Sequence, residues 1–104
     1  MIYVANFDDK SVSVIDGKTN SVVKIIPVGS SPNAVAINPN SNMIYVANFD
    51  DSTVSVIDGK TNNEIGNLGV GKSPDGVAIN PNTNMIYVAN QGRDTVSIMK
   101  GTMN

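Results

Sequence analysis

The sequence predicts an all-β protein made of repeats. The hexapeptide Met-Ile-Tyr-Val-Ala-Asn occurs three times at a constant spacing of 42 residues, at Met1–Asn6, Met43–Asn48 and Met85–Asn90. Each repeat holds short β-favouring runs separated by the turn formers Gly, Pro, Asn and Asp, and no helical periodicity is present. A period in the low forties built from such runs is typical of β-propeller blades of four antiparallel strands.

The chain reads as one domain, 1–104, with two full repeats and a partial one, 1–42, 43–84 and 85–104. The first two repeats are identical at 29 of 42 positions without a gap. Ten strands are expected: one complete blade lies between a blade lacking its innermost strand and a blade lacking its outermost strand. Closed propellers have about 4–8 blades, so these two and a half repeats form an incomplete ring.

The first two strands of a blade differ in character. The innermost strand is predicted at Asn33–Asn38 and Asp75–Asn80, where small residues suit a crowded axis. The second strand is predicted at Ile2–Asn6, Ile44–Asn48 and Ile86–Asn90. It carries apolar residues on both faces, which predicts a strand packed between two neighbouring sheets.

The outer half of a blade is predicted to be more exposed. The third strand, at Ser11–Asp16, Thr53–Asp58 and Thr95–Met99, alternates Val with Ser. In the first two repeats it ends in Asp-Gly-Lys-Thr-Asn, a turn in which Gly is expected to take the positive φ. The outermost strand, at Val22–Val28 and Ile65–Val70, differs most between repeats, as expected for a solvated rim.

Composition excludes several function classes. The chain is 40% hydrophobic and 15% charged with a net charge of −2, too weak a charge to predict binding to nucleic acid or to an anionic membrane. Because Cys and His are absent, disulfides, thiolate metal sites and histidine chemistry are excluded. No apolar run approaches the ~20 residues of a membrane span. The N-terminus lacks the basic region and apolar stretch of a secretion signal, but this decides little because Met1 is itself a repeat position, equivalent to Met43 and Met85.

The candidate interaction residues lie in the loop between the second and third strands. This loop carries an aromatic residue and two carboxylates in each full repeat: Phe7, Asp8, Asp9, Phe49, Asp50 and Asp51. Paired carboxylates are hard ligands that suit Ca²⁺, but the spaced pattern of a calcium loop is absent and acidic residues are ordinary in turns. The two phenylalanines fit plugs under a loop better than sugar-stacking platforms.

Other repeated residues favour structural roles. Tyr3, Tyr45 and Tyr87 recur at one strand position, which favours packing between blades over a ligand channel. The Asn that ends each second strand is expected to satisfy backbone groups. Asp16 and Asp58 precede Gly-Lys-Thr, but the spacing of a phosphate-binding loop is absent, so a turn is favoured.

The last repeat diverges near its end. Met99 and Met103 lie in this divergent tail, which either caps the last blade or frays.

The motifs resemble a known family. Ile-Tyr-Val-Ala-Asn followed by Asp-Asp, Val-Ser-Val-Ile-Asp, Pro-Val-Gly and Asn-Ala-Val-Ala-Ile-Asn-Pro is similar to the YVTN family of β-propeller repeats, over essentially the whole chain. Ala5, Ala47 and Ala89 replace the usual threonine of that family, and the third repeat has Gln-Gly-Arg-Asp after the motif. The resemblance implies a surface-layer or other extracellular or cell-surface repeat scaffold, and it transfers no catalytic residue.

These observations predict a noncatalytic module for protein or glycan interaction. No catalytic, cofactor-binding or metal-binding residue is assigned. The alternative is a fragment of a propeller enzyme of the lactonase, lyase or quinoprotein kind, for which Asp75 is the acidic residue on an innermost strand. An excised or engineered set of blades is a third interpretation that the sequence leaves open.

The open blades predict a partner. A four-stranded blade face covers roughly 400 Å², which is the size at which exposed apolar patches mark interaction sites. We expect self-association into a homo-oligomer, or coverage by further repeats of a longer protein. Two chains give about six blade positions, whereas exchange of an innermost strand between chains gives a ring of three or four chains.

Overall fold

The computed structural model describes residues 1–101, which form ten strands in three antiparallel sheets. The first sheet contains β1 (Ile2–Asn6), β2 (Ser11–Asp16) and β3 (Ser21–Pro27). The second contains β4 (Pro32–Asn38), β5 (Met43–Asn48), β6 (Thr53–Asp58) and β7 (Asn63–Gly69). The third contains β8 (Pro74–Asn80), β9 (Met85–Asn90) and β10 (Thr95–Lys100).

The predicted strand order is confirmed. The second sheet is complete, in the order β4-β5-β6-β7, whereas the first sheet lacks an innermost strand and the third lacks an outermost one. Boundaries differ by one or two residues from the sequence prediction. Pro32 and Pro74 begin the innermost strands one residue early, a position where a missing N–H is tolerated.

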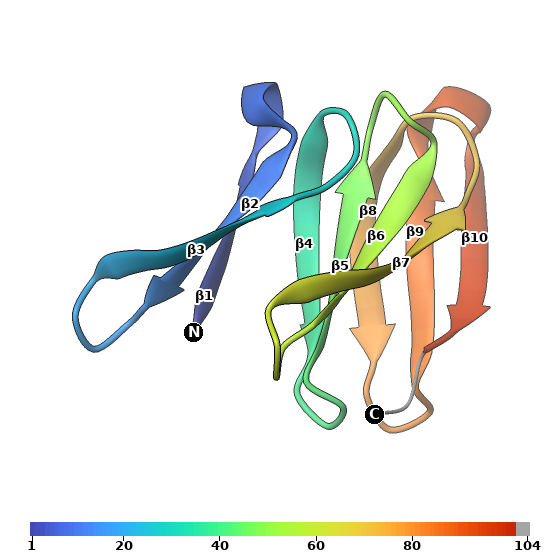
Figure 1. Ribbon diagram of the computed structural model, residues 1–104. Helices are drawn as coiled ribbons and strands as arrows, with labels where there is room; N and C mark the ends of the chain where they lie inside the picture. The colour runs from blue at the N-terminus through green and yellow to red at the C-terminus, as the bar shows by residue number, and fades with distance from the viewer. Residues whose placement is uncertain (102–104) are drawn as a thin grey trace.

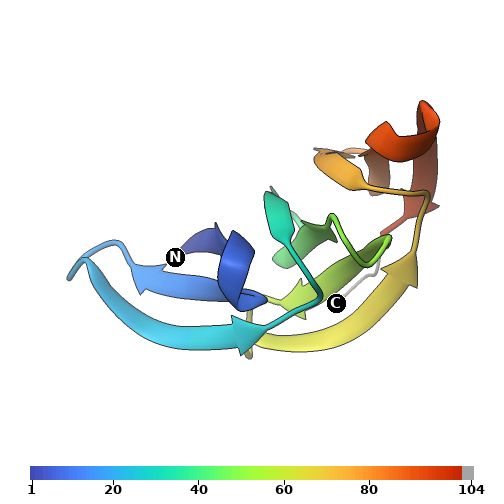
Figure 2. The ribbon, with the colours of Figure 1, turned by 90° about the horizontal axis from the view of Figure 1, so that it is seen from above.

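The three sheets stand beside one another like the blades of a fan (Figure 1). Seen from above, β3 and β7 follow the convex outer rim, and β4 and β8 lie toward the inside of the curve (Figure 2). Two single-turn 3-10 helices, η1 (Phe7–Asp9) and η2 (Gln91–Arg93), were not predicted. Because the described residues contain no longer helix, they offer no helical membrane span.

The turns depend on asparagine rather than glycine. In the Asp-Gly-Lys-Thr-Asn turns, Asn20 and Asn62 take the left-handed conformation, each with a φ of 57°. The prediction for glycine is wrong, since no described glycine has a positive φ. The Asp16 carboxylate accepts the backbone N–H of Lys18 at 2.9 Å, so this segment is the expected turn. Asn tolerates the left-handed region better than most residues because its short side chain bonds locally.

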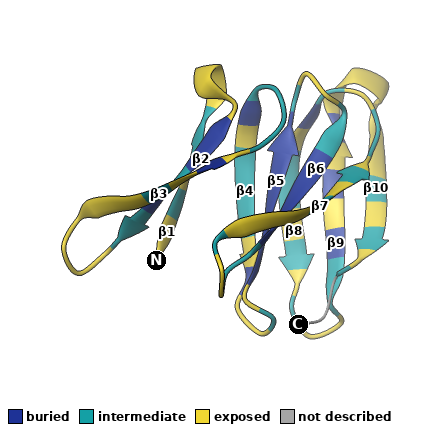
Figure 3. Ribbon diagram, viewed as in Figure 1, coloured by how far each residue is buried: buried dark blue, intermediate teal, exposed yellow. Residues whose placement is uncertain are grey.

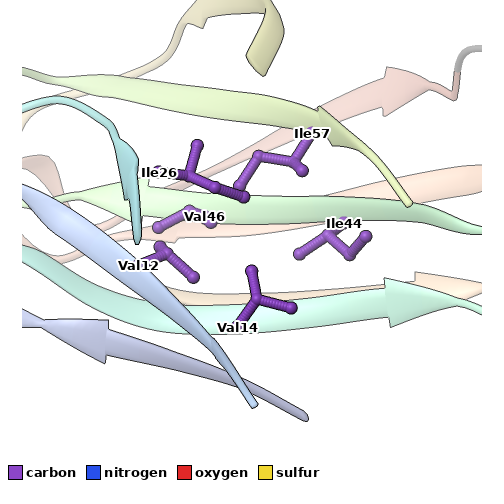
Figure 4. Close-up of a cluster of buried hydrophobic side chains, with 6 residues drawn as sticks. All are labelled: Val12, Val14, Ile26, Ile44, Val46 and Ile57. Atoms are coloured by element: carbon purple, nitrogen blue, oxygen red, sulfur yellow. The ribbon is translucent and has the colours of Figure 1, made fainter. Parts of the chain in front are cut away.

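Two hydrophobic clusters fill the spaces between the sheets. The cluster between the first and second sheets is shown in Figure 4 and contains Val12, Val14, Ile26, Ile44, Val46 and Ile57. The cluster between the second and third sheets contains Met43, Tyr45, Val54, Val56, Ile86 and Val88. Many members recur 42 residues apart, so one interface is built twice by the same repeat positions.

The burial of the second strand of each sheet depends on how many neighbouring sheets cover it. All six residues of β5 are buried, because this strand has a sheet against each face (Figure 3). Its counterparts β1 and β9 each have exposed residues, because each has a neighbouring sheet on one face only. The prediction of burial on both faces therefore holds for the complete sheet alone.

Met99 has a defined place in the structure. It lies in β10 at the repeat position of Ile57 and packs, half-buried, against the second cluster. The interpretation of this part of the chain as a frayed or capping tail is therefore wrong for Met99. Met103 lies outside the described residues.

Candidate functional site

The predicted interaction loop is a short turn with a fixed backbone. In the first repeat it is η1 followed by Lys10 with a φ of 54°, and the equivalent Ser52 and Asp94 have φ values of 56° and 52°. Phe7 is 51% exposed and Asp8 and Asp9 are exposed. The first copy of the loop therefore presents an aromatic ring beside two carboxylates.

The second copy of the loop is used internally. Residues 29–31, which connect the first sheet to the second, cross it and are held by several hydrogen bonds. The N–H of Ser30 donates to Asp51 Oδ2 at 2.7 Å, and the hydroxyl of Ser31 donates to Asp50 Oδ2 at 2.5 Å. The N–H of Phe49 donates to the carbonyl of Ser31 at 2.9 Å. Phe49 itself is half-buried.

The third sheet repeats the backbone part of this arrangement. The N–H groups of Gln91 and Gly92 donate to the carbonyls of Ser73 and Lys72, each at 3.0 Å. The carboxylates are absent here because Gln-Gly-Arg replaces Phe-Asp-Asp. In the second sheet the equivalent backbone bonds run from Phe49 to Ser31 and from Asp50 to Ser30. The same two backbone hydrogen bonds therefore hold the connection in both sheets, and the acidic pair adds side-chain hydrogen bonds in the second repeat.

An asparagine clamp lies beneath each loop. The amide Nδ2 of Asn48 donates to Thr53 Oγ1 at 3.2 Å and to Ser55 Oγ at 2.9 Å, and Asn6 and Asn90 bond the equivalent hydroxyls. The expectation that these asparagines satisfy backbone groups is wrong, because their amides bond side-chain hydroxyls on the adjacent strand. Asn48 is fully buried and its Oδ1 has no hydrogen-bond partner among the described residues.

Glycine is required where the connection crosses the clamp. A Cβ on Gly29 would lie 2.8 Å from the amide of Asn48 and 2.5 Å from Asp51 Oδ2. A Cβ on Gly71 would lie 2.7 Å from the amide of Asn90. The connection therefore lies directly on the clamp, and a side chain at either glycine would displace it.

In the first sheet no described segment covers the clamp and the loop. An open hollow of about 480 Å³ lies over them. Its lining residues come from β1, β2, β3 and the loop: Asn6, Asp9, Lys10, Ser11, Ser13, Ile25 and Pro27. The structure thus brings Asp9 to a hollow, leaves Phe7 and Asp8 at the surface, and ties Asp50 and Asp51 to the connection.

Two sheet faces are also left uncovered by residues 1–101. We call the outward face of the first sheet the leading face; it exposes Ile2 (47%) and Val4 (42%). We call the outward face of the third sheet the trailing face; it exposes Tyr87 (37%), Val96 and Ile98 (61% each). An open hollow of about 340 Å³, lined by Tyr87, Val96 and neighbouring small residues, lies on the trailing face.

Tyr3 and Tyr45 lie between sheets as predicted, whereas Tyr87 does not. Tyr45 is fully buried in the second cluster, and Tyr3 packs on the first cluster and donates its hydroxyl to Asn62 Oδ1 at 2.7 Å. Burial, reinforced by the negative charge of Asp58, raises the pKa of Tyr3 above its ordinary value. Tyr87 occupies the same repeat position on the trailing face, and its hydroxyl makes no hydrogen bond to the described residues.

A polar hollow lies at the opposite end of the sheets. It has a volume of about 250 Å³ and is lined by Asn38, Asn40, Ser41, Pro81, Asn82, Thr83 and Asn84. Asn38 Nδ2 donates to Asn84 Oδ1 at 3.0 Å, and Asn40 Nδ2 donates to the carbonyl of Pro81 at 3.0 Å. These amides join the β4–β5 turn to the β8–β9 turn, which gives them a structural role.

The acidic residues of residues 1–101 do not gather into a metal site. No group of three or more potential ligands of the Asp, Glu, His and Cys types is found there. The Asp-Asp pairs lie one in each full repeat, and the second pair already accepts hydrogen bonds from Ser30 and Ser31.

Known proteins share this geometry. No family model matches the chain, and no curated protein matches it. Among solved structures, hydrazine synthase from Kuenenia stuttgartiensis is similar over 94% of this chain, with a TM-score of 0.89 and 30% identity. Dihydro-heme d1 dehydrogenase NirN in complex with DHE is similar over 95%, with a TM-score of 0.83 and 16% identity. Both are β-propeller proteins. The chain has a β-propeller fold.

The match concerns a segment of a propeller. The chain spans 28% of the hydrazine synthase chain and 21% of the NirN chain. A functionally unknown protein from Desulfotomaculum acetoxidans is similar over 90% of this chain and 35% of its own, with a TM-score of 0.68 and 17% identity. Because no family model matches, the resemblance to the YVTN family remains a prediction.

The sequence alone did not predict a role for the connection between sheets. The signal was present, because Val-Gly-x-Ser-Pro occurs at residues 28–32 and again at 70–74, one repeat apart. A segment that recurs in both repeats with Gly at the same position indicates that its backbone lies close to another part of the chain. The partner of that approach, the buried Asn at the end of the second strand, could be identified only from the structure.

Proposed function

We propose that this chain is a noncatalytic propeller module of the YVTN type, with a surface-layer or other cell-surface location, that binds protein or glycan through its loops. The observation that carries the proposal is the uncovered first loop. Phe7 is half-exposed beside Asp8 and Asp9, whereas the same three residue types in the second repeat are engaged within the fold. An exposed aromatic residue beside polar groups is typical of contact surfaces.

The innermost strands support a noncatalytic role. β4 reads Pro-Asn-Ala-Val-Ala-Ile-Asn and β8 reads Pro-Asp-Gly-Val-Ala-Ile-Asn, so the positions nearest the axis are almost the same in both sheets. A catalytic centre in such a fold needs residues that differ between blades, because the acid, base and substrate contacts have different roles.

The test of loop binding is a comparison of two equivalent substitutions. The chain is screened on an array of bacterial and archaeal surface glycans and on purified surface-layer protein. Phe7→Ala is expected to reduce binding about tenfold without changing the melting temperature, and Phe49→Ala is expected to lower the melting temperature because Phe49 is half-buried. Absence of binding to every probe, or binding unaffected by Phe7→Ala, contradicts the proposal.

A second candidate is a segment of a propeller enzyme. It is favoured by the 30% identity to a segment of hydrazine synthase. Asp75, exposed at the second position of β8, is the acidic residue on an innermost strand. Hydrolase activity that depends on added divalent metal and is lost in Asp75→Ala would favour this candidate over the noncatalytic module.

We also propose that the leading and trailing faces bind each other between copies of the chain. Each internal interface places the second and third strands of one sheet against the same strands of the next. Val12 and Val14 contact Ile44 and Val46 in the first cluster (Figure 4). The trailing face supplies Val96 and Ile98 at the positions of Val12 and Val14, and the leading face supplies Ile2 and Val4 at the positions of Ile44 and Val46.

The proposed junction between copies can also form a hydrogen bond. Within the chain, Tyr3 donates to Asn62, which lies in a left-handed turn position. The equivalent pair across the proposed junction is Tyr87 of one copy and Asn20 of the next, and Asn20 has the same φ of 57° as Asn62. The junction is therefore supported by polar as well as apolar groups.

The number of copies follows from the number of sheets. Two copies supply six blade positions, whereas three supply nine, outside the 4–8 of known propellers. A three-stranded face covers roughly 280 Å² from strand spacing and rise, so the four faces of a closed dimer bury about 1,100 Å², near the lower limit for a stable interface. We propose a head-to-tail dimer.

Charge substitutions on the two faces test this arrangement. Val4→Lys blocks the leading face and Val96→Glu blocks the trailing face, and each variant alone is expected to have the 10.9 kDa mass of one chain by light scattering. An equimolar mixture is expected to form a dimer, because one junction is then unaltered and the other pairs Lys with Glu. Tyr87→Phe is expected to weaken dimerisation, with Tyr3→Phe as its control inside the fold.

The two single variants distinguish head-to-tail pairing from pairing of like faces. If like faces paired instead, each single variant would still dimerise through its unaltered face, and the head-to-tail arrangement would be wrong. A folded wild-type monomer at high concentration would also contradict it. Circular dichroism of each variant checks that the strands remain intact.

A further inference from the structure

The polar hollow between the β4–β5 turn and the β8–β9 turn is formed by internal segments of the chain. Its seven lining residues belong to these two turns and to the end of β4. The turns lie side by side at one end of the second and third sheets (Figure 1). The hollows of about 480 Å³ and 340 Å³, in contrast, lie on the first sheet alone and on the third sheet alone. The polar hollow is therefore a feature of the junction between two neighbouring sheets.

Hydrogen bonds fix the walls of this hollow. Asn38 Nδ2 donates to Asn84 Oδ1, and Asn40 Nδ2 donates to the carbonyl of Pro81, each at 3.0 Å. Within the first turn, Asn38 Oδ1 also accepts the N–H of Asn40 at 3.0 Å. Asn38 is 1% exposed, so this part of the wall is anchored in the fold. A site with walls already in place loses less free energy on binding than a mobile one.

Other polar groups of the lining are not used inside the fold. The side-chain amide of Asn82 and the hydroxyl of Thr83 are on exposed residues and make no hydrogen bond to the rest of the described chain. The Oγ of Ser41 is buried and has no hydrogen-bond partner among residues 1–101. A buried hydroxyl without a partner is costly, and rotation about one side-chain bond can turn it towards a new partner. The hollow therefore offers donors and acceptors beyond those that hold its walls together.

The chemistry of the lining favours a neutral ligand rich in hydroxyl groups. All seven lining residues are Asn, Ser, Thr or Pro, so the hollow offers no opposite charge to a phosphate, a carboxylate or an ammonium group. An asparagine amide presents donors and an acceptor side by side, and a hydroxyl both donates and accepts. Neighbouring hydroxyls of a sugar match this pattern. Pro81 adds an apolar ring against which the C–H groups of a sugar can pack.

The size of the hollow fits one sugar unit. Its volume is about 250 Å³. This is far more than the roughly 10–15 Å³ that holds one water molecule, and less than the roughly 300–1,000 Å³ of sites for drug-sized ligands. A sugar replaces several waters at once, and its hydroxyls can reproduce their hydrogen bonds, so little is lost when those waters leave.

We propose that this hollow binds one neutral sugar unit, either a free sugar or the end of a glycan chain. Asn82 and Thr83 bond its hydroxyls, whereas Asn38 and Asn40 keep the two turns in place. The hollow lies at the opposite end of the sheets from the loop that carries Phe7 (Figure 1). It is therefore a site in addition to that loop, and it does not depend on the binding proposed there.

A nuclear magnetic resonance titration of the full chain tests the site. The probes are glucose, galactose, mannose and N-acetylglucosamine. At least one is expected to shift the side-chain amide signals of Asn40 and Asn82 in a saturable way. Asn82→Ala and Thr83→Val, which remove groups that make no hydrogen bond to the described chain, are each expected to weaken this binding at least about fivefold. Asn33→Ala is the matched control, because Asn33 is an exposed asparagine near the other end of β4.

A second comparison identifies the source of the sugar. A trisaccharide that ends in the sugar with the strongest binding is titrated beside the free sugar. Equal or tighter binding of the trisaccharide supports the end of a glycan chain as the ligand. Binding of the free sugar alone supports a small soluble sugar.

Three results would overturn the proposal. They are the absence of a saturable shift with all four sugars, binding that is unchanged in both Asn82→Ala and Thr83→Val, and equal binding of N-acetylglycinamide, which would show recognition of an amide rather than of a sugar. Circular dichroism checks that each variant keeps its strands. Phe7→Ala is expected to leave this binding unchanged, so failure at the hollow and failure at the loop are distinguished.

Discussion

Truncation of one isoleucine in the complete sheet tests the packing of the fold. Ile44 in β5 is 0% exposed and lies in the first cluster, whereas Ile2, at the same repeat position in β1, is 47% exposed on the leading face. Ile44→Ala and Ile2→Ala therefore remove the same atoms from the same strand position. The two variants differ in whether a second sheet covers the site.

The expected magnitudes follow from these exposures. Replacing Ile by Ala removes three carbon groups at about 0.8 kcal/mol each when they are fully buried, roughly 2.4 kcal/mol. The cavity left between two sheets adds to this, so Ile44→Ala is expected to cost about 3–4 kcal/mol, within the usual range for such changes. Ile2 loses about half of the transfer contribution and leaves no closed cavity, which gives roughly 1 kcal/mol.

Urea unfolding, followed by circular dichroism and tyrosine fluorescence, measures the difference. Both variants should retain the wild-type dependence on urea concentration, with the midpoint lowered much more for Ile44→Ala. In thermal melts, about 3 kcal/mol corresponds to a decrease of roughly 12–24 °C for a domain of this size. The protein is kept dilute so that dimerisation does not bury Ile2. Equal losses in the two variants would refute the assignment of β5 as a strand packed on both faces.

Three further predictions concern the connection, the clamp and the tyrosine. Gly29→Ala is expected to lower stability by about 1–3 kcal/mol in urea unfolding because of overpacking on the clamp, whereas Gly69→Ala, with nothing within 4 Å of the added Cβ, is expected to be neutral. Asn48→Ala should be more destabilising than Asn6→Ala, because Asn48 is fully buried and its loss removes the N–H donor of two hydroxyl oxygens, those of Thr53 and Ser55; equal melting temperatures would contradict this. Since the folded-state pKa of Tyr3 is raised, its contribution is fully present below about pH 10 and is lost as the pH rises through that raised value; Tyr3→Phe should reduce the loss of stability at alkaline pH, and an unchanged pH profile would contradict the assignment.

Much of the fold could be predicted because each strand and turn pattern occurs in two or three repeats at the same spacing. β1, β2 and β6 have the predicted boundaries, since Asn and Asp mark the end of each run. The outer strands differ from their predicted boundaries by one or two residues. β3 and β7 each contain an extra, unpaired residue, Val23 and Ile65, at a shift of register with the neighbouring strand. A bulge depends on pairing with another strand, so a local pattern does not reveal it.

The candidate site was only partly predictable, for a related reason. Phe7, Asp8 and Asp9 were recognised as a loop, but Phe49, Asp50 and Asp51 have the same sequence and a different environment. The difference is imposed by residues 29–31, which lie across the second loop and not across the first. Both loops end in a left-handed residue, but residues 7–9 form a 3-10 helix and residues 49–51 do not. The local environment of the loop therefore depends on the neighbouring sheet as well as on its sequence.

The acidic pair illustrates how the same repeat position can make an internal contact in one sheet and remain exposed in another. In the second repeat, Asp50 and Asp51 accept hydrogen bonds from the connection and stabilise the junction between sheets. Asp8 and Asp9 lie in the equivalent loop of the first repeat, where no described segment crosses above them and an open hollow lies beside Asp9. The loop binding that we propose for this module therefore requires no new residues. It arises wherever a repeat keeps the groups that hold its neighbour and the neighbouring segment is not in place.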